Sequence, residues 1–360
     1  MKALHVIDSL GRGGAEQVLL TLLPALRAQG CAVEVAVRRA PYDLQPDLEA
    51  RGITVHHLPK TGRWALLRQA RSLAKLVRQI NADIVHAHLY FPAMTVALMR
   101  FLLLCPAQTF VTFHNLAYAG ANSFGLGLKV KKRLASLLYP RGMDGMFGVS
   151  DAVARHYQSA LRLRYVAVLN NPIELPAEQM GATRVQPPFR IVLPGRLVPE
   201  KGHTDLIAAL ALLKIPVETV FCGGGPLQAD LAANAPDIRI TGPLTHPQMM
   251  QEIAGADLVV VPSHFEGFGL TALEAMALSR PVIASTAGGL PEVLGDTGVL
   301  VPPGDPQALA DAITDLLGNP DKRKSLGQAA RQRAEKQFSA AAIASQLLSH
   351  YRQSLETPIQ

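Results

Sequence analysis

The chain has 360 residues, 49% of them hydrophobic and 18% charged, which excludes a disordered chain and predicts two domains rather than one compact core. Three scattered cysteines without metal-like spacing exclude a disulfide framework and favour a reducing, cytoplasmic setting, and no apolar run reaches the roughly 18 residues of a membrane span. The net charge of +7 is uneven, because residues 1–175 hold 21 Lys and Arg against 10 Asp and Glu, and a basic half suggests contact with something anionic.

Short β-branched runs alternate with helical patterns along the first half of the chain. The predicted strands are Leu4–Ile7, Ala32–Val37, Thr54–His57, Ile84–Ala87 and Gln108–Thr112, with helices such as Glu16–Gln29 and Trp64–Ile80 between them. The apolar start resembles a short signal sequence, but His5 and Asp8 interrupt it, so we interpret it as a buried strand. This alternation predicts a parallel sheet with helices on both faces.

A glycine-rich loop follows the first predicted strand. It lacks the Gly-x-Gly-x-x-Gly spacing of dinucleotide-binding proteins, and no acidic residue ends the second strand, which disfavours a dehydrogenase. We expect its glycines, Gly13 and Gly14, to touch a phosphate or sugar instead.

Three histidines lie at the ends of two neighbouring predicted strands. His86 and His88 project from one face of the first, and His114 ends the next. Three interpretations are open: a metal site, satisfied strand-end histidines, or contacts to a substrate. No carboxylate completes a metal-ligand spacing. We therefore predict no metal and favour substrate contacts, with His114 the strongest candidate.

The pattern stops near residue 172 and restarts near residue 189, so we predict a linker over residues 173–188. The later predicted strands are Arg190–Leu193, Val217–Cys222, Arg239–Thr241, Leu258–Pro262 and Val282–Ala284. The later predicted helices are His203–Leu213, Pro226–Asn234, Pro247–Ala254, Leu270–Leu278, Gln307–Leu317, Asp321–Phe338 and Ala340–Leu355. We expect two Rossmann-like, doubly wound domains, residues 1–172 and 189–339, facing a central cleft, with residues 340–360 packed back on the first domain.

The densest chemical signal joins a predicted strand to the predicted helix at Leu270. The first helical amides, those of Leu270 and Thr271, have no partners within the helix and form an anion site, which Gly269 leaves open to a diphosphate. Glu266 precedes the helix and reaches towards the cleft. Glu274 lies one turn into it, where it can accept hydrogen bonds from paired hydroxyls such as those of a ribose. An ordinary glycine-rich turn with a surface glutamate is the less favoured alternative.

Two cations and a glycine run follow other predicted strands of this half. Arg196 and Lys201 come directly after a strand, where they can stabilise the charge of a departing diphosphate; two solvated surface cations are the alternative. The run Gly223–Gly225 is a weaker signal. We expect Gly224 to let a nucleotide base or a neighbouring backbone pack closely.

Taken together, these motifs resemble those of family 4 retaining glycosyltransferases, which have the GT-B fold. The matching segments are Gly13-Gly14-Ala15-Glu16, His86-x-His88, Phe113-His114, Gly148-Val149-Ser150, Asn171-Pro172-Ile173, Gly195-Arg196-Leu197 with Lys201-Gly202, Gly223-Gly224-Gly225-Pro226, Glu266 to Glu274, Pro281-Val282-Ile283-Ala284, Gly288-Gly289-Leu290-Pro291-Glu292 and Val301-Pro302-Pro303-Gly304-Asp305. The resemblance runs through nearly the whole chain in order.

The resemblance implies a role for each matching residue. Arg196 and Lys201 would bind the donor diphosphate together with the amides of Leu270 and Thr271. Glu274 would hold the ribose and Glu266 the hydroxyls of the transferred sugar. His114 would contact that sugar near the reacting carbon, and Gly13 and Gly14 would close over the donor phosphate. The implied enzyme needs neither a metal nor another cofactor.

The resemblance also implies an activity. We expect a hexosyltransferase that moves a hexose or N-acetylhexosamine, with retention, from a nucleotide diphosphate sugar to a glycan or lipid-linked acceptor, in cell-envelope polysaccharide or lipopolysaccharide synthesis. Two alternatives stay open. A nucleotide-sugar epimerase of the same fold would release free sugar without an acceptor, and a non-catalytic binding module would bind the donor only.

A basic segment bears on the acceptor. Lys129, Lys131, Lys132 and Arg133 fall within five positions beside leucines. One interpretation is a helix lying on an anionic membrane, which would place a cytoplasmic protein on the inner face of the plasma membrane; the other is a solvated helix with a buried leucine stripe. Nucleic acid is disfavoured, because no stacking aromatics are interleaved.

Overall fold

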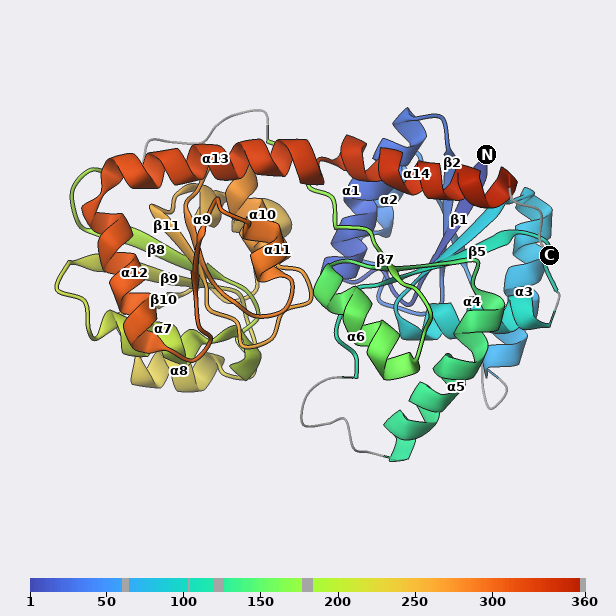
Figure 1. Cartoon of the computed structure of the whole chain (residues 1–360), viewed down its shortest axis with the longest axis horizontal. Helices are drawn as coiled ribbons and strands as arrows, with labels where there is room; N and C mark the ends of the chain where they lie inside the picture. Colours follow the sequence, from blue (N-terminus) through green and yellow to red (C-terminus); the bar gives the residue numbers. More distant parts are fainter. Residues whose placement is uncertain (60–64, 103, 119–125, 177–183, 357–360) are drawn as a thin grey trace. The chain divides into compact units, whose positions relative to one another are not determined.

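The computed structural model describes residues 1–59, 65–102, 104–118, 126–176 and 184–356. The chain divides into two compact units (Figure 1). The first unit comprises Met1–Pro172 with Ala340–Gln360, and the second comprises Ile173–Ser339. Among the described residues, no helix is both long and apolar enough to cross a bilayer.

The first unit is built on a parallel sheet in the order β3-β2-β1-β4-β5-β6-β7. Its strands are β1 (Lys2–Ile7), β2 (Ala32–Val37), β3 (Thr54–His57), β4 (Ile84–His88), β5 (Gln108–Phe113), β6 (Gly145–Gly148) and β7 (Ala167–Val168). Its helices are α1 (Gly14–Ala28), α2 (Gln45–Ala50), α3 (Ala65–Ile80), α4 (Tyr90–Phe101), α5 (Leu126–Gly142), α6 (Asp151–Leu161) and α14 (Ala340–Glu356).

Helices α1 and α14 lie side by side over one face of this sheet (Figure 1). On α1 the buried residues recur at helical spacing, Leu19, Leu22, Leu23 and Leu26, and they share one core with Tyr351 of α14. Helix α14, the last described helix, therefore packs on the unit that contains the N-terminus of the chain. Helices α3, α4 and α5 pack in series, and α4 contacts β4 and β5.

The second unit holds a parallel sheet in the order β10-β9-β8-β11-β12-β13. Its strands are β8 (Phe189–Pro194), β9 (Val217–Cys222), β10 (Arg239–Ile240), β11 (Leu258–Val261), β12 (Val282–Ser285) and β13 (Val299–Val301). Its helices are α7 (His203–Leu210), α8 (Gln228–Asn234), α9 (His246–Ala254), α10 (Leu270–Ala277), α11 (Leu290–Leu294), α12 (Pro306–Gly318) and α13 (Pro320–Phe338). Both units are doubly wound α/β sheets, in which ligands bind beyond the carboxyl ends of the strands.

The described parts of the predicted linker are anchored to the second unit. The amide of Ile173 donates to the carbonyl of Phe338, and Ile173 forms an isolated parallel bridge with Ser339. Further along, the guanidinium of Arg184 pairs with Asp257 at 3.0 Å. The predicted linker is therefore held at both of its described ends, by backbone pairing at Ile173 and by an ion pair at Arg184. Residues 177–183 lie outside the described part.

Candidate functional site

The ends of β8 and β11 bring together two residues that the sequence assigned to the donor. Lys201 ends a 3₁₀ turn, Pro199–Lys201, and Glu266 lies between β11 and α10. The ammonium of Lys201 donates a hydrogen bond to Oε2 of Glu266, with the side chains 19% and 15% exposed. Arg196 is exposed and forms no ion pair with any described residue. One cation is therefore held by a carboxylate and the other is free to move.

A second loop fixes the backbone beneath Glu266. Gly288 has a φ of 55°, and a Cβ placed there would lie 1.7 Å from the carbonyl oxygen of Glu266. The amide of Gly289 donates to that same oxygen at 3.3 Å. The absence of a side chain at residue 288 is what lets the two loops meet, since no Cβ tolerates such a contact. This glycine pair thus positions Glu266.

Helix α10 begins at the edge where these loops lie. Its N-cap, Gly269, is left-handed with a φ of 104°, a conformation that glycine adopts without strain. The amides of Leu270 and Thr271 open the helix and carry the positive end of its dipole. Glu274, 7% exposed, receives a hydrogen bond from Nε2 of His246 at 3.0 Å. That hydrogen bond raises the pKa of His246, so the imidazole beside the buried carboxylate holds a proton more readily than a free histidine does.

The glycine run after β9 makes close backbone contacts. A Cβ on Gly223 would lie 2.1 Å from the carbonyl oxygen of Gly195, and one on Gly224 would lie 2.8 Å from Pro243. The carbonyl of Gly224 accepts the amide of Leu197 at 3.0 Å. The run therefore lets the loops after β8 and β9 pack together.

In the first unit, His114 follows β5 and lies against His88. Nε2 of His114 is 3.0 Å from Nδ1 of His88, and His114 is partly exposed. His86 and His88 are 0% and 1% exposed, too deep to touch a substrate. His86 is bonded to Thr112 and to the hydroxyl of Tyr351. The hypothesis of substrate contacts is therefore wrong for His86 and His88, which are satisfied strand-end histidines.

His5, His86 and His88 have ligand atoms within 4.8 Å of one another, which is close enough for a metal cluster. Their ring nitrogens, however, are already hydrogen-bonded, except for Nε2 of His5: Nδ1 of His5 to Nε2 of His88, both nitrogens of His86 to Tyr351 and Thr112, and Nδ1 of His88 to His114. A metal ion needs a free lone pair on one nitrogen of each ring, and these hydrogen bonds already engage the nitrogens that face one another. This geometry argues against a metal site among them.

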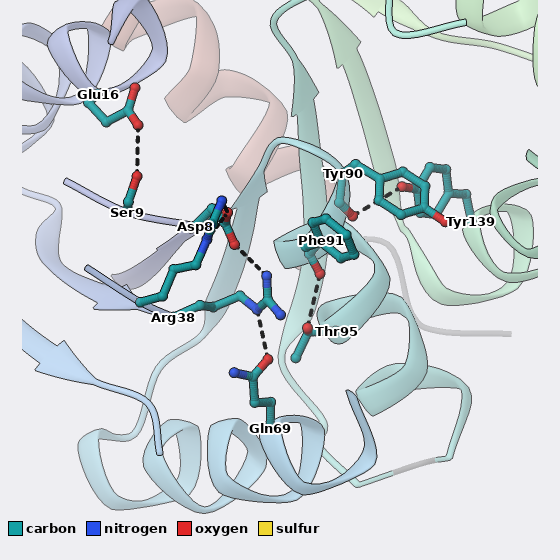
Figure 2. Close-up of polar contacts among 10 residues, drawn as sticks. Asp8, Ser9, Glu16, Arg38, Gln69, Tyr90, Phe91, Thr95 and Tyr139 are labelled. Carbon is teal, nitrogen blue, oxygen red and sulfur yellow. Dashed lines mark hydrogen bonds and ion pairs between the residues drawn. The ribbon is translucent and has the colours of Figure 1, made fainter. Parts of the chain in front are cut away.

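The start of α1 places a carboxylate beside the predicted phosphate-binding glycines. Gly13 is the N-cap, and both Gly13 and Gly14 are exposed. The carboxylate of Glu16 folds back over Gly13 and accepts a hydrogen bond from Ser9 at 3.2 Å (Figure 2). Burial raises the pKa of Glu16. An anion approaching this helix start therefore meets a carboxylate that already occupies it.

Comparison with known proteins identifies the family. The model of glycosyl transferases group 1 matches residues 179–333, and that of glycosyltransferase family 4 matches residues 12–176. A glycogen synthase of Mycobacterium tuberculosis is 30% identical over 78% of this chain and 71% of its own length. The chain is a family 4 glycosyltransferase.

Other relatives and solved structures agree with this assignment. The D-inositol 3-phosphate glycosyltransferase of Thermobispora bispora is 29% identical over 96% of this chain and 90% of its own. The structure of Anabaena HepE with UDP and glucose superposes with a TM-score of 0.81 at 22% identity, covering 98% and 99% of the two chains. A sucrose-phosphate synthase from Thermosynechococcus elongatus gives 0.80 at 22% identity, covering 98% and 99%. The glycosyltransferase therefore has the two-domain GT-B fold.

The glycosyltransferase also carries a polar group that its sequence did not reveal. Asp8 follows β1 and pairs with the guanidinium group of Arg38 (Figure 2). It also pairs with the guanidinium group of Arg39. Nε of Arg38 donates to Gln69 at 2.7 Å, and its guanidinium lies 5.3 Å from the ring centre of Phe91. The strand order brings Asp8 and Arg38 together, since the carboxyl ends of β1 and β2 are neighbours.

Helix α5 of the glycosyltransferase presents the predicted basic cluster to solvent together with apolar side chains. Lys129, Lys131, Lys132 and Arg133 are all exposed. Val130, Leu134 and Leu137 share one helical face and are 51%, 44% and 50% exposed. The ammonium of Lys131 lies 5.1 Å from the ring centre of Phe91, which is 44% exposed. Leu134 and Leu137 are therefore not buried, which differs from the interpretation of α5 as a solvated helix with a buried leucine stripe. We call these seven residues of α5 the α5 surface.

Proposed function

We propose that this glycosyltransferase is a retaining enzyme that moves a hexose or N-acetylhexosamine from a nucleoside diphosphate sugar to a glycan or lipid-linked acceptor. The proposed setting is cell-envelope polysaccharide or lipopolysaccharide synthesis. The observation that carries the donor half is the pairing of Lys201 with Glu266 just before the start of α10. The ammonium of Lys201, the carboxylate of Glu266 and the first amides of α10 then lie at one edge of the sheet.

Each group at this edge suits one part of the donor. Lys201, Arg196 and the first amides of α10 offer positive charge to a diphosphate. Glu274, almost fully buried and bonded on one oxygen by His246, keeps acceptor capacity for ribose hydroxyls. Glu266 would exchange its bond with Lys201 for the hydroxyls of the sugar. The HepE structures contain UDP and UDP-glucose, so UDP-glucose is the first donor to test.

The proposed chemistry follows from where charge develops. As the glycosidic bond breaks, negative charge grows on the departing phosphate, and fixed cations with helix amides stabilise it. The enzyme would therefore need no metal. In a front-face reaction the departing phosphate oxygen takes the proton of the attacking hydroxyl, so no pair of flanking carboxylates is required. The predicted role of His114 is to contact the sugar near the reacting carbon.

The acceptor half rests on the α5 surface. The described part of α5 contains four neighbouring cations and no acidic residue, which suits the negative potential of an anionic leaflet. The exposed Val130, Leu134 and Leu137 would enter the interface, and apolar contact together with charge is what holds interfacial helices. A lipid-linked acceptor lies in such a leaflet.

The donor site is tested by thermal shift with UDP-, GDP- and ADP-sugars in EDTA. A shift by one nucleotide class supports a metal-independent donor site, and it should be lost in Lys201→Ala but kept in Lys214→Ala, a matched exposed lysine of the same unit. No shift with any sugar nucleotide would contradict the proposal and favour a non-catalytic module. Product analysis separates the other alternative, because an epimerase releases free sugar without an acceptor.

A further inference from the structure

A line of hydrogen-bonded histidines crosses the sheet of the first unit and ends at His114. His5 of β1 and His86 of β4 are direct neighbours in register, and His88 lies two residues further along β4 on the same face. Nδ1 of His5 is 3.0 Å from Nε2 of His88, and Nδ1 of His88 is 3.0 Å from Nε2 of His114. We call His5, His88 and His114 the histidine relay.

The relay is uncharged at neutral pH. His5 and His88 are 0% and 1% exposed, and burial lowers the pKa of His5 to about 3 and that of His114 to about 4. Burial also holds the pKa of His88 well below its ordinary value. Each neutral imidazole has one N–H donor and one bare nitrogen acceptor. The direction of one hydrogen bond in the relay therefore dictates the direction of the next.

The buried end of the relay favours one direction. Nε2 of His5 is buried and has no hydrogen-bond partner among the described residues. A buried N–H without a partner is rarer and more costly than a buried lone pair without one. The proton of His5 is therefore on Nδ1, which donates to His88. His88 in turn must carry its proton on Nδ1 and donate to Nε2 of His114.

We propose that His5 and His88 are positioning residues that hold His114 as the Nδ1–H tautomer, so that His114 donates a hydrogen bond to an oxygen of the bound substrate. Nδ1 of His114 makes no hydrogen bond within the described chain and is the relay's outer end. The substrate contact rests on the proposed function, whereas the tautomer does not.

The first test is nitrogen NMR of the substrate-free protein with labelled histidine, with the His114 signals assigned by their loss in His114→Gln. We expect His88 and His114 both to be neutral Nδ1–H tautomers at pH 7. Nε2–H tautomers at either residue would overturn the relay's direction. Because no substrate is present, this result is independent of the proposed function.

The second test separates positioning from packing. His5→Phe keeps an aromatic ring but removes the donor, whereas His5→Asn keeps an amide N–H near the position of Nδ1. His350→Phe makes the same change at a histidine outside the relay. We expect His5→Phe to mix the tautomers of His114, His5→Asn to restore the Nδ1–H form, and His350→Phe to leave it unchanged. An unaltered His114 tautomer in folded His5→Phe would overturn the proposal.

The third test measures hydrolysis of the nucleotide sugar by water, which needs no acceptor. His5→Phe should lower kcat by about tenfold to a hundredfold, the range for a misdirected hydrogen bond to a transition state, with a smaller change in KM. His5→Asn should recover part of that loss. An altered tautomer with unchanged kcat would overturn the substrate contact while leaving the relay in place.

Discussion

Lys201 and Glu266, which lie 65 residues apart in the chain, form an ion pair in the substrate-free glycosyltransferase. The pair keeps a cation and a carboxylate in place before a donor binds, and preorganised charge costs no rearrangement during the reaction. A diphosphate would compete with Glu266 for the ammonium, and the released carboxylate would then face the sugar. On the proposed function, the ion pair would be a resting state from which each side chain moves a short way to its part of the donor.

Removing the charge of Lys201 or of Arg196 should slow the reaction far more than it destabilises the protein. Lys201→Ala, or Arg196→Ala, should lower kcat/KM by roughly a hundredfold or more, because each removes charge that stabilises the leaving diphosphate. Turnover of a nucleotide sugar is the measurement, with Lys214→Ala as the control. Near-wild-type turnover in either variant would remove that residue from the mechanism.

Glu274 should act on donor affinity rather than on the chemical step. Glu274→Ala removes a buried acceptor for ribose hydroxyls and leaves His246 without its partner, so binding of the nucleoside diphosphate should weaken by about tenfold to a hundredfold. Titration calorimetry with the nucleotide measures this. The pKa of His246 should fall towards its ordinary value in the same variant, because its raised pKa depends mainly on Glu274. Unchanged affinity would refute the assignment.

The α5 surface should bind anionic vesicles through charge and apolar contact together. Helix α3 provides the matched control, since Arg68, Arg71, Lys75 and Arg78 are also exposed but have no exposed large apolar neighbours on that helix. Replacing Lys129, Lys131 and Lys132 by alanine should abolish flotation with phosphatidylserine vesicles, whereas the same change at Arg68, Arg71 and Lys75 should not.

Two outcomes of the flotation experiment would contradict the membrane proposal. If the wild-type protein ignores anionic vesicles at low salt, the acceptor is not delivered by the α5 surface. A soluble acceptor would then be favoured. Equal loss in the α3 and α5 variants would show that net charge alone drives binding, without the exposed leucines.

Local sequence signals identified most of the residues of the proposed donor site, but few of the polar contacts in the first unit. Glu266, Lys201 and Gly269 lie at strand and helix ends, where spacing along the chain already dictates what a side chain can do. The pairing of His5 with His88 depends instead on which strands are neighbours and in which register. A single sequence does not contain that register. From the sequence, His5 could be interpreted only as a polar residue that interrupts an apolar segment.

The same reason explains two other differences. Asp8 and Arg38 meet because β1 and β2 are adjacent, and Phe91 joins them from the start of α4. The exposure of Leu134 and Leu137 was open in the sequence, because a leucine stripe predicts burial unless the neighbouring helix leaves it uncovered. Strand and helix boundaries, by contrast, mostly agreed within one or two residues.

Acid should destabilise the first unit through its buried histidines. The pKa values of His5, His86 and His88 are all lowered in the folded protein, so these side chains stay neutral there. In the unfolded chain the same histidines take up protons as the pH falls below their ordinary pKa of 6.5. The contribution of these histidines to the free energy of unfolding is fully present above pH 6.5. It is lost as the pH falls towards the pKa of the folded state, which is about 3 for His5. Between pH 7 and 5.5 the loss should be about 1 kcal/mol for each histidine.

Hydrogen exchange of the β1 and β4 amides at pH 7 and pH 5.5, corrected for intrinsic rates, measures this loss. His5→Asn should reduce it by about one histidine's share. His246, whose pKa is raised, contributes in the opposite direction, but it belongs to the second unit, whereas β1 and β4 belong to the first. Equal protection at the two pH values would contradict the prediction.

Gly288 should be required for the position of Glu266. Gly288→Ala places a Cβ against the carbonyl oxygen of Glu266 at a positive φ, so the loop must move and take the carboxylate away from Lys201. Gly242→Ala is the matched control, because residue 242 also has a positive φ, 70°, but open space around it. Both changes should cost about 1–2 kcal/mol of backbone strain, and only Gly288→Ala should also lower kcat/KM, by about tenfold or more. If Gly288→Ala and Gly242→Ala lose stability and activity equally, the contact with Glu266 has no role in positioning it.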